Sequence, residues 1–200
     1  MNNKEVQQRV LQNGKPLNLD KFSWDEKTNT FSSDEDDLVI DFNDIDYCVF
    51  NTGSYCTFKT GFNCTFKTGT DCTFNTGFNC TFKTGTDCTF NTGSYCVFNT
   101  GSYCTFKTGS DCTFDTGSYC TFDTGSDCTF NTGSYCVVIR RDIYEIIELE
   151  ENKKIKLHKF KVKGFDIINE TDNNKKQELI DKADELINKA NELKEEAEKL

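Results

Sequence analysis

Twelve cysteines are the residues of this sequence with the most chemistry to offer, because thiols form disulfides, bind metals and act as nucleophiles. They recur at a fixed interval of eight residues, and no close Cys-x-x-Cys pair occurs. A strict period indicates one repeated structural position, and Ile40, eight residues before the first cysteine, indicates that this position is apolar. We expect reduced thiols in a buried core; some disulfides, or a metal or redox role, are the alternatives. The cysteines are Cys48, Cys56, Cys64, Cys72, Cys80, Cys88, Cys96, Cys104, Cys112, Cys120, Cys128 and Cys136.

Few other residues could support catalysis. His158 is the only histidine and lies among lysines, which is typical of a surface residue rather than a general base. No phosphate-binding loop, dinucleotide motif or nucleophile elbow occurs. Two pairs of acids, Asp115 with Asp123 and Asp111 with Asp127, could bind calcium, although solvated corner acids are the simpler interpretation. We predict no enzymatic activity, no metal site and no cofactor.

Each cysteine except the last opens an octet of the form Cys-Thr/Val-Phe-x-Thr-Gly-x-x. Apolar and polar residues alternate in Cys-Thr-Phe-x, which predicts a short strand with Cys and Phe on its inner side. Thr-Gly then ends the strand, and we expect the glycine to adopt a left-handed backbone at the corner. The predicted core ladder combines the cysteines with Phe50, Phe58, Phe66, Phe74, Phe82, Phe90, Phe98, Phe106, Phe114, Phe122 and Phe130.

One octet is too short to close a coil, whereas two octets provide two strands and two corners in sixteen residues. The corner pairs support this length, because Phe62-Asn63 matches Phe78-Asn79 sixteen residues later. The two strands of a coil run in opposite directions, so the Cys end of one is expected to face the Phe end of the other. The predicted fold is mainly β: a two-sided parallel β-solenoid with about 16 residues per coil, capped at both ends, plus a C-terminal α-helix.

Four segments divide the chain. Residues 1–39 are predicted to form an N-terminal cap, with a helix over residues 5–12 and a hairpin between Trp24 and Phe31. Residues 40–139 form the octapeptide-repeat solenoid. Residues 140–168 form a C-terminal β cap, with strands over 143–149 and 154–163, and residues 169–200 form a linker and an amphipathic helix.

The last segment carries a heptad seam on a helix rich in Glu and Lys. The predicted helix could pack against its own solenoid or associate with another copy of the chain. Its regular composition is also that of designed helices. The seam residues are Leu179, Ala183, Leu186, Ala190, Leu193, Ala197 and Leu200.

The charge of the chain narrows the choice of partners. Its formal net charge is -10, which disfavours contact with nucleic-acid phosphates or with anionic membrane surfaces. No stretch is long and apolar enough to span a bilayer, and the N-terminus lacks the apolar core of a secretory signal. We expect a cytoplasmic protein in a reducing environment, with no nucleic-acid or membrane partner.

Two kinds of outward residue could make contacts. Tyr103, Tyr119 and Tyr135 should line one edge of the solenoid, and exposed tyrosines are favoured at protein contacts. Outward threonines should form ladders, as in ice-binding solenoids, although each strand offers only one such threonine. One ladder is Thr57, Thr73, Thr89, Thr105 and Thr121, and the other is Thr65, Thr81, Thr113 and Thr129, interrupted by Val97.

The Cys-Thr-Phe-x-Thr-Gly repeats, the acidic residues 36–42 before them and the residues 136–142 after them support a family resemblance. In these features the chain resembles uncharacterised octapeptide-repeat β-solenoid proteins of viral, phage and environmental origin. The resemblance covers about residues 1–165. It implies a repeat solenoid and brings no known activity or catalytic residue.

These features favour a rigid structural or protein-interaction solenoid without catalytic activity. It would act through a protein partner or by self-association. The alternative is a ligand-binding solenoid, which would use outward threonines to bind ice or corner aspartates to bind a divalent metal such as calcium.

Overall fold

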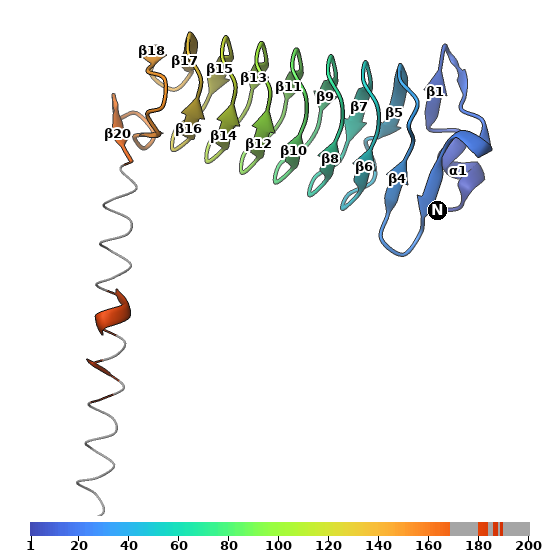
Figure 1. The fold of residues 1–200 in the computed structure, drawn as a ribbon, viewed down its shortest axis with the longest axis horizontal. Coiled ribbons are helices and arrows are strands. Elements are labelled where there is room, and N and C mark those ends of the chain that lie inside the picture. Colours follow the sequence, from blue (N-terminus) through green and yellow to red (C-terminus); the bar gives the residue numbers. More distant parts are fainter. Residues whose placement is uncertain (169–179, 184–185, 188, 190–200) are drawn as a thin grey trace, which may run out of the picture. The chain divides into compact units, whose positions relative to one another are not determined.

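The computed structural model describes residues 1–168, 180–183, 186–187 and 189, and it confirms a mainly β fold (Figure 1). The chain divides into two compact units, Met1–Asp166 and Ile167–Leu200. Ahead of the repeats lie α1 (Asn3–Gln7), β1 (Val10–Gln12), β2 (Lys15–Pro16), the 3-10 helix η1 (Leu19–Lys21), β3 (Ser23–Asp25), β4 (Thr30–Ser32) and β5 (Leu38–Phe42).

Each octet supplies one short strand, and three further strands follow the repeats. The repeat strands are β6 (Val49–Asn51), β7 (Thr57–Thr60), β8 (Thr65–Lys67), β9 (Thr73–Asn75), β10 (Thr81–Lys83), β11 (Thr89–Asn91), β12 (Val97–Thr100), β13 (Thr105–Lys107), β14 (Thr113–Thr116), β15 (Thr121–Thr124), β16 (Thr129–Thr132) and β17 (Cys136–Arg140). The following strands are β18 (Glu145–Leu149), β19 (Ile155–Leu157) and β20 (Phe165–Ile167).

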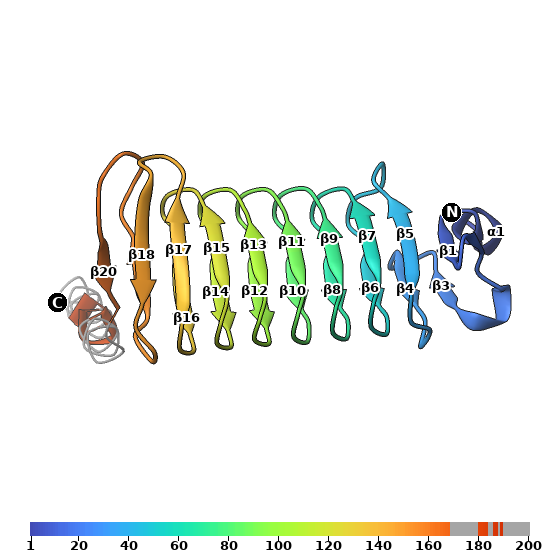
Figure 2. The same cartoon turned by 90° about the horizontal axis from the view of Figure 1, so that it is seen from above.

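Consecutive strands alternate between two sheets, which we name sheet A and sheet B. Sheet A stacks β5, β7, β9, β11, β13, β15 and β17 in parallel, and sheet B stacks β4, β6, β8, β10, β12, β14 and β16 in the same way. Phe58 pairs with Phe74, and Phe66 with Phe82, so one coil takes sixteen residues as predicted. Figure 2 shows the coils side by side from above.

Phenylalanine rings fill the centre of every coil. Rings one coil apart stack nearly parallel, with centroids 4.9 Å apart and planes 3° apart for Phe74 and Phe90. Rings from the two sheets meet edge to face, with centroids 5.2 Å apart at 75° for Phe82 and Phe90. Each ring therefore contacts its own column and the facing column, which is the geometry that aromatic quadrupoles favour.

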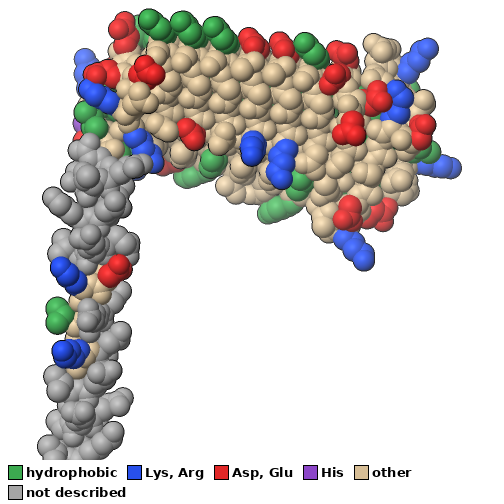
Figure 3. Space-filling model, in the orientation of Figure 1, with side chains coloured by type: hydrophobic (Ala, Val, Ile, Leu, Met, Phe, Trp, Pro, Cys, Tyr) green, Lys and Arg blue, Asp and Glu red, His purple; other side chains and the backbone are tan. Residues whose placement is uncertain are grey.

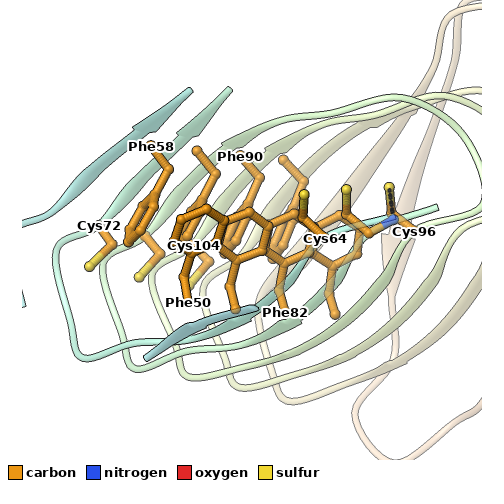
Figure 4. Close-up of a cluster of buried hydrophobic side chains, with 14 of the residues drawn as sticks. Phe50, Phe58, Cys64, Cys72, Phe82, Phe90, Cys96 and Cys104 are labelled. Carbon is orange, nitrogen blue, oxygen red and sulfur yellow. Dashed lines mark hydrogen bonds between the residues drawn. The ribbon is translucent and has the colours of Figure 1, made fainter. Parts of the chain in front are cut away.

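The predicted pairing of Cys with Phe across the core is wrong. Each strand has three inward positions rather than two, because the Thr two residues after Phe also points inward, as Thr100 and Thr108 do. Phe is thus the middle position and meets Phe, while the thiol of Cys104 lies beside the hydroxyl of Thr100. Figure 4 shows the result, with Cys72 and Cys104 on one side of the rings and Cys64 and Cys96 on the other.

The glycines at the corners do not have the left-handed backbone that we expected. The positive φ, from 54° to 61°, belongs to the residue just before each cysteine. Glycine is needed because the coils stack closely: a Cβ on Gly101 would lie 2.6 Å from the Thr86 Cγ2 and 2.9 Å from the Thr86 backbone nitrogen. The corner glycines therefore allow close approach of backbones rather than unusual torsion angles.

Ile40 does not occupy the cysteine position. It pairs with Phe58, and Leu38 stands two residues before it, in the position of Cys56. The corner between Phe42 and Cys48 is two residues longer than the later corners, so counting back by eight misplaces Ile40. The apolar character of the cysteine position still holds, because Leu38 is fully buried there.

The caps use elements shorter than those predicted. The first helix ends at Gln7, and Val10–Gln12 forms a strand that pairs antiparallel with β5. The predicted hairpin is present, with Trp24 opposite Phe31. Parallel stacking already begins at β4, which lies inside the segment predicted as the cap.

A buried arginine holds the C-terminal cap. The Arg140 side chain is 0% exposed and its Nη2 lies 2.8 Å from the Asp142 Oδ2. Its Nη1 donates a hydrogen bond to the Val162 carbonyl and lies 3.5 Å from the Glu145 carboxylate. Because a buried cation needs charged and hydrogen-bonding partners, this cluster ties residues 159–164 to the last coil.

The helix seam falls largely outside the described residues, which exclude Leu179, Ala190, Leu193, Ala197 and Leu200. Ala183 and Leu186 are described, and both are helical and exposed. Among the described residues, no helix has the length and hydrophobicity needed to cross a membrane.

Candidate interaction surface

The cysteines form two buried columns of six, which run along the solenoid on the two sides of the phenylalanine rings (Figure 4). All twelve are free thiols, and none is more than 1% exposed. Hydrogen bonding to Cys64 and Cys96, together with burial, raises the pKa of the Cys80 thiol. Its sulfur also lies 3.6 Å from the Phe78 carbonyl oxygen. Because all twelve thiols are buried away from solvent, these columns contribute to core packing.

His158 is fixed by its own loop. Its Nδ1 lies 2.6 Å from the Lys163 carbonyl oxygen, and its Nε2 lies 3.1 Å from the Asp166 Oδ1. These two partners raise the pKa of His158, because both favour the protonated ring. The adjoining hollow, about 420 Å³, is lined by Asp127, Lys156, Leu157, His158, Lys159, Val162 and Asp166. The two contacts of the ring therefore hold the loop of residues 158–166 in place.

The acid pairs do not gather into a metal site. Asp111 and Asp127 occupy successive positions on one corner edge, and Asp115 accepts a hydrogen bond from Asn131 at 2.9 Å. Within the described part of the chain, no group of three or more His, Cys, Asp or Glu side chains could hold a metal ion.

The solenoid presents two long corner edges, each with one residue of positive φ per coil. One edge carries Tyr47, Asn63, Asn79, Tyr95, Asp111 and Asp127, and the other carries Tyr55, Asp71, Asp87, Tyr103, Tyr119 and Tyr135. Asn and Asp tolerate this conformation best, whereas Tyr has no such preference. Half of these positions nevertheless carry tyrosine.

Three successive tyrosines form a stacked, exposed row, which we name the tyrosine edge: Tyr103, Tyr119 and Tyr135. The rings of Tyr103 and Tyr119 are 5.1 Å apart at 2°, and those of Tyr119 and Tyr135 are 5.0 Å apart at 15°. Their exposed fractions are 57%, 50% and 74%. Figure 3 shows hydrophobic side chains in a row along one long edge, followed by acidic ones.

Backbone and serine hydrogen bonds make this edge rigid. The Tyr103 amide donates to the Ser118 carbonyl, and the Tyr119 amide to the Ser134 carbonyl, each at 2.9 Å. The Ser118 amide donates to the Ser102 hydroxyl at 2.9 Å, and the Ser134 amide to the Ser118 hydroxyl at 3.0 Å. Every coil is thereby bonded to the next at the corner itself, so the tyrosines are held at fixed spacing.

The opposite edge holds a smaller aromatic group, built on the phenylalanines whose sixteen-residue spacing indicated the length of the coil. The rings of Phe62 and Phe78 stack with centroids 4.8 Å apart, and Tyr47 packs against Phe62 at 6.3 Å. Its signal in the sequence was the Phe-Asn corner pair, which recurs sixteen residues apart. One coil further on, Ser94 takes the place of Phe78, and beyond Tyr95 the edge carries Asp111 and Asp127, so the group does not extend along the edge as the tyrosines do.

The threonine ladders lie where they were predicted. Thr57, Thr73 and Thr89 pair in register on sheet A, and the ladder continues through Thr105 and Thr121. On sheet B, Val97 pairs with Thr81 and Thr113 and interrupts the second ladder.

Comparison with family models, curated proteins and solved structures found no match for this chain.

Proposed function

We propose that this protein is a rigid interaction module that presents the tyrosine edge to a protein partner and has no catalytic activity. The observation that carries this proposal is the run of three exposed tyrosines at positive-φ positions. Asn or Asp fits those positions with less backbone strain, and other coils of the same edge use Asp. The tyrosines also provide large, rigid contact area, which is characteristic of the energetic centre of protein interfaces.

The test replaces the tyrosine edge without disturbing the coil. A triple variant, Tyr103→Asn, Tyr119→Asn and Tyr135→Asn, uses a residue that the chain already carries at Asn63 and Asn79. The matched control makes the same change on the opposite edge, with Tyr47→Asn and Tyr95→Asn. A photo-crosslinking residue at Asp87, the exposed position next to Tyr103 on the same edge, then captures proteins from the source cells, which are identified by mass spectrometry. We expect capture by the wild type and the control and loss with the triple variant; equal capture by all three would contradict the proposal.

Self-association through the heptad seam is a second route to a partner. Among the described helical residues, Ile180, Leu186 and Ile187 are 43%, 68% and 57% exposed, and apolar side chains in such a stripe favour a helical partner. Leu186→Glu is expected to lower the mass measured by sedimentation, whereas Lys182→Glu, on the same helical stretch, is expected to leave it unchanged. Equal masses for the two variants would contradict self-association through the heptad seam.

The alternative function is ice binding by sheet A. It is supported by the in-register ladder from Thr57 to Thr121, which gives a flat array at the strand spacing of about 4.8 Å. Thermal hysteresis that disappears in Thr89→Lys but remains in Thr113→Lys, on the other sheet, would favour ice binding. Absence of thermal hysteresis in the wild type would contradict ice binding.

A further inference from the structure

The outer face of sheet B carries two columns of exposed or half-exposed side chains. The first column is Val49, Thr65, Thr81, Val97, Thr113 and Thr129, and the second is Asn51, Lys67, Lys83, Asn99, Asp115 and Asn131. The face is flat because each strand pairs in register with the next. The distribution of charged and apolar side chains over this face therefore follows from the order of the residues along the two columns.

That order is self-complementary about one strand, β12. Val97, on β12, is 45% exposed and is an apolar residue with a threonine on either side of it in the first column. Asn99 is the neutral residue beside it in the charged column. One strand before them stands Lys83, and one strand after them stands Asp115, with the opposite charge.

A two-fold axis lying along β12 would use this order. Such an axis reverses the order of the strands and keeps each column facing its own copy, as an isologous interface requires. Val97 then meets the partner's Val97, and Asn99 meets the partner's Asn99. Lys83 faces the partner's Asp115, and Asp115 faces the partner's Lys83, so two ion pairs form for each apolar contact.

We propose that sheet B is a face for dimerisation with a second copy of this chain, in antiparallel orientation and centred on β12. The proposal is independent of the tyrosine edge, because the faces of the solenoid and its corner edges are different surfaces. Charge complementarity favours a second copy of this chain as the partner. Only a surface with the order of Lys83, Asn99 and Asp115 reversed places opposite charges against both Lys83 and Asp115, and the two-fold axis provides that surface.

Sheet A has the same geometry, but its opposite charges lie two strands from any such axis rather than one. Its charged column reads Asp41, Lys59, Asn75, Asn91, Lys107 and Asp123. A two-fold axis along β11 would place Lys59 opposite the partner's Asp123, and one along β9 would place Asp41 opposite the partner's Lys107. Asp123 is already paired with Arg141 at 3.1 Å, and no apolar residue interrupts the threonine ladder between Thr57 and Thr121.

The contact area is that of a weak, transient dimer. A stack of seven strands about 4.8 Å apart, roughly 10 Å wide, offers about 300 Å² on each copy, against about 800 Å² for a standard interface. The dimer should therefore be weak, forming at high micromolar concentration. Exposed ion pairs are screened by salt, so association should decrease as the ionic strength rises.

The experiment uses exchanged charges, and every chain carries Leu186→Glu so that the helix seam does not contribute. Sedimentation equilibrium of this protein is expected to show a monomer–dimer equilibrium. Lys83→Asp places like charges opposite each other in the dimer, and so does Asp115→Lys, so each variant alone is expected to be monomeric. These surface positions already accept Lys, Asn and Asp in different octets, so neither change should disturb the fold.

Mixing the two monomeric variants gives the decisive result. One chain then carries two acids and the other two lysines, so a heterodimer regains both ion pairs. We expect the mixture to dimerise at least as well as the parent protein. The control, Lys107→Asp, makes the same change of charge on sheet A and should leave the equilibrium unchanged.

Three outcomes would overturn the proposal. The parent protein could remain monomeric at millimolar concentration, which would show that the face has no affinity for itself. The single-charge variants could dimerise as well as the parent, or their mixture could stay monomeric. Each of these results would show that Lys83 and Asp115 do not face each other in a dimer.

Discussion

The interior of the solenoid and its corner edges follow different rules. Inside, every coil repeats Cys, Phe and Thr almost unchanged, because each side chain packs against its own copy sixteen residues away, as Phe74 does against Phe90. At the corners, the exposed residue changes between Tyr, Asn and Asp while the backbone keeps the same positive φ. The comparison teaches that the core determines the coil, and that the corners can vary without altering it.

Removing one ring from the interior should have the largest effect. Phe90 stacks on Phe74 and Phe106 and meets Phe82 and Phe98 edge to face, so Phe90→Ala removes four ring contacts and leaves a cavity. We expect a loss of about 3–5 kcal/mol in the free energy of unfolding, measured by urea denaturation. A loss of less than about 1 kcal/mol would show that the core can collapse around the gap.

A methyl group at a corner should have the next largest effect. In Gly101→Ala the new Cβ overlaps the Thr86 side chain and backbone, so adjacent coils must move apart at a loss of about 1–3 kcal/mol in stability. Gly14→Ala is the matched comparison, since Gly14 has φ +74° and nothing within 4 Å of a Cβ. Its loss should be about 1 kcal/mol, from torsional strain alone. Equal losses, measured by thermal denaturation, would argue against close stacking as the reason for the corner glycines.

The cysteine columns should contribute less per residue. Cys96→Ala removes one buried sulfur and is expected to lower stability by about 1 kcal/mol, comparable to one methylene group. In the wild type, all twelve thiols should resist a thiol reagent in the folded state and react after denaturation. Rapid reaction of the folded protein, or fewer than twelve reactive thiols in denaturant, would contradict a reduced, buried core.

The smallest effect on stability is expected at the tyrosine edge. Tyr119→Asn exchanges ring stacking for a residue that prefers positive φ, so the two effects should nearly cancel, to within about 0.5 kcal/mol. Chemical denaturation would measure this change. A loss above about 2 kcal/mol would mean that the tyrosines are part of the structural frame rather than a surface for contacts.

The sequence alone predicted the coil because the period of sixteen is visible in the corner pairs, and it placed the twelve cysteines and eleven phenylalanines of the ladder in the core. It could not show the third inward position, because a threonine at the end of a strand is equally compatible with a solvent-facing turn. It also missed the role of Gly101, since the obstacle is Thr86 of the preceding coil and not the glycine's own torsion angle.

The N-terminal end of the solenoid was harder to predict than its repeats. Counting by eight gave Ile40 the wrong position because the corner before Cys48 has two extra residues, and a period cannot reveal where it is first broken. Similarly, Val10 fits helical spacing, yet it forms a strand because β5 offers an unpaired sheet edge. In both cases a neighbour distant in sequence decides the local structure. For the candidate surface, the row of three tyrosines followed from the sixteen-residue period alone.

The alternation of octets between two sheets also limits how such a chain could lengthen. Duplicating a single octet would transfer every later strand to the opposite sheet and bring Arg140 and the C-terminal cap to the wrong side of the last coil. Duplicating two adjacent octets would shift the same residues by one whole turn and preserve all their neighbours. Gene duplication should therefore extend the rod in steps of two octets, and each step would add one position to both edges at once.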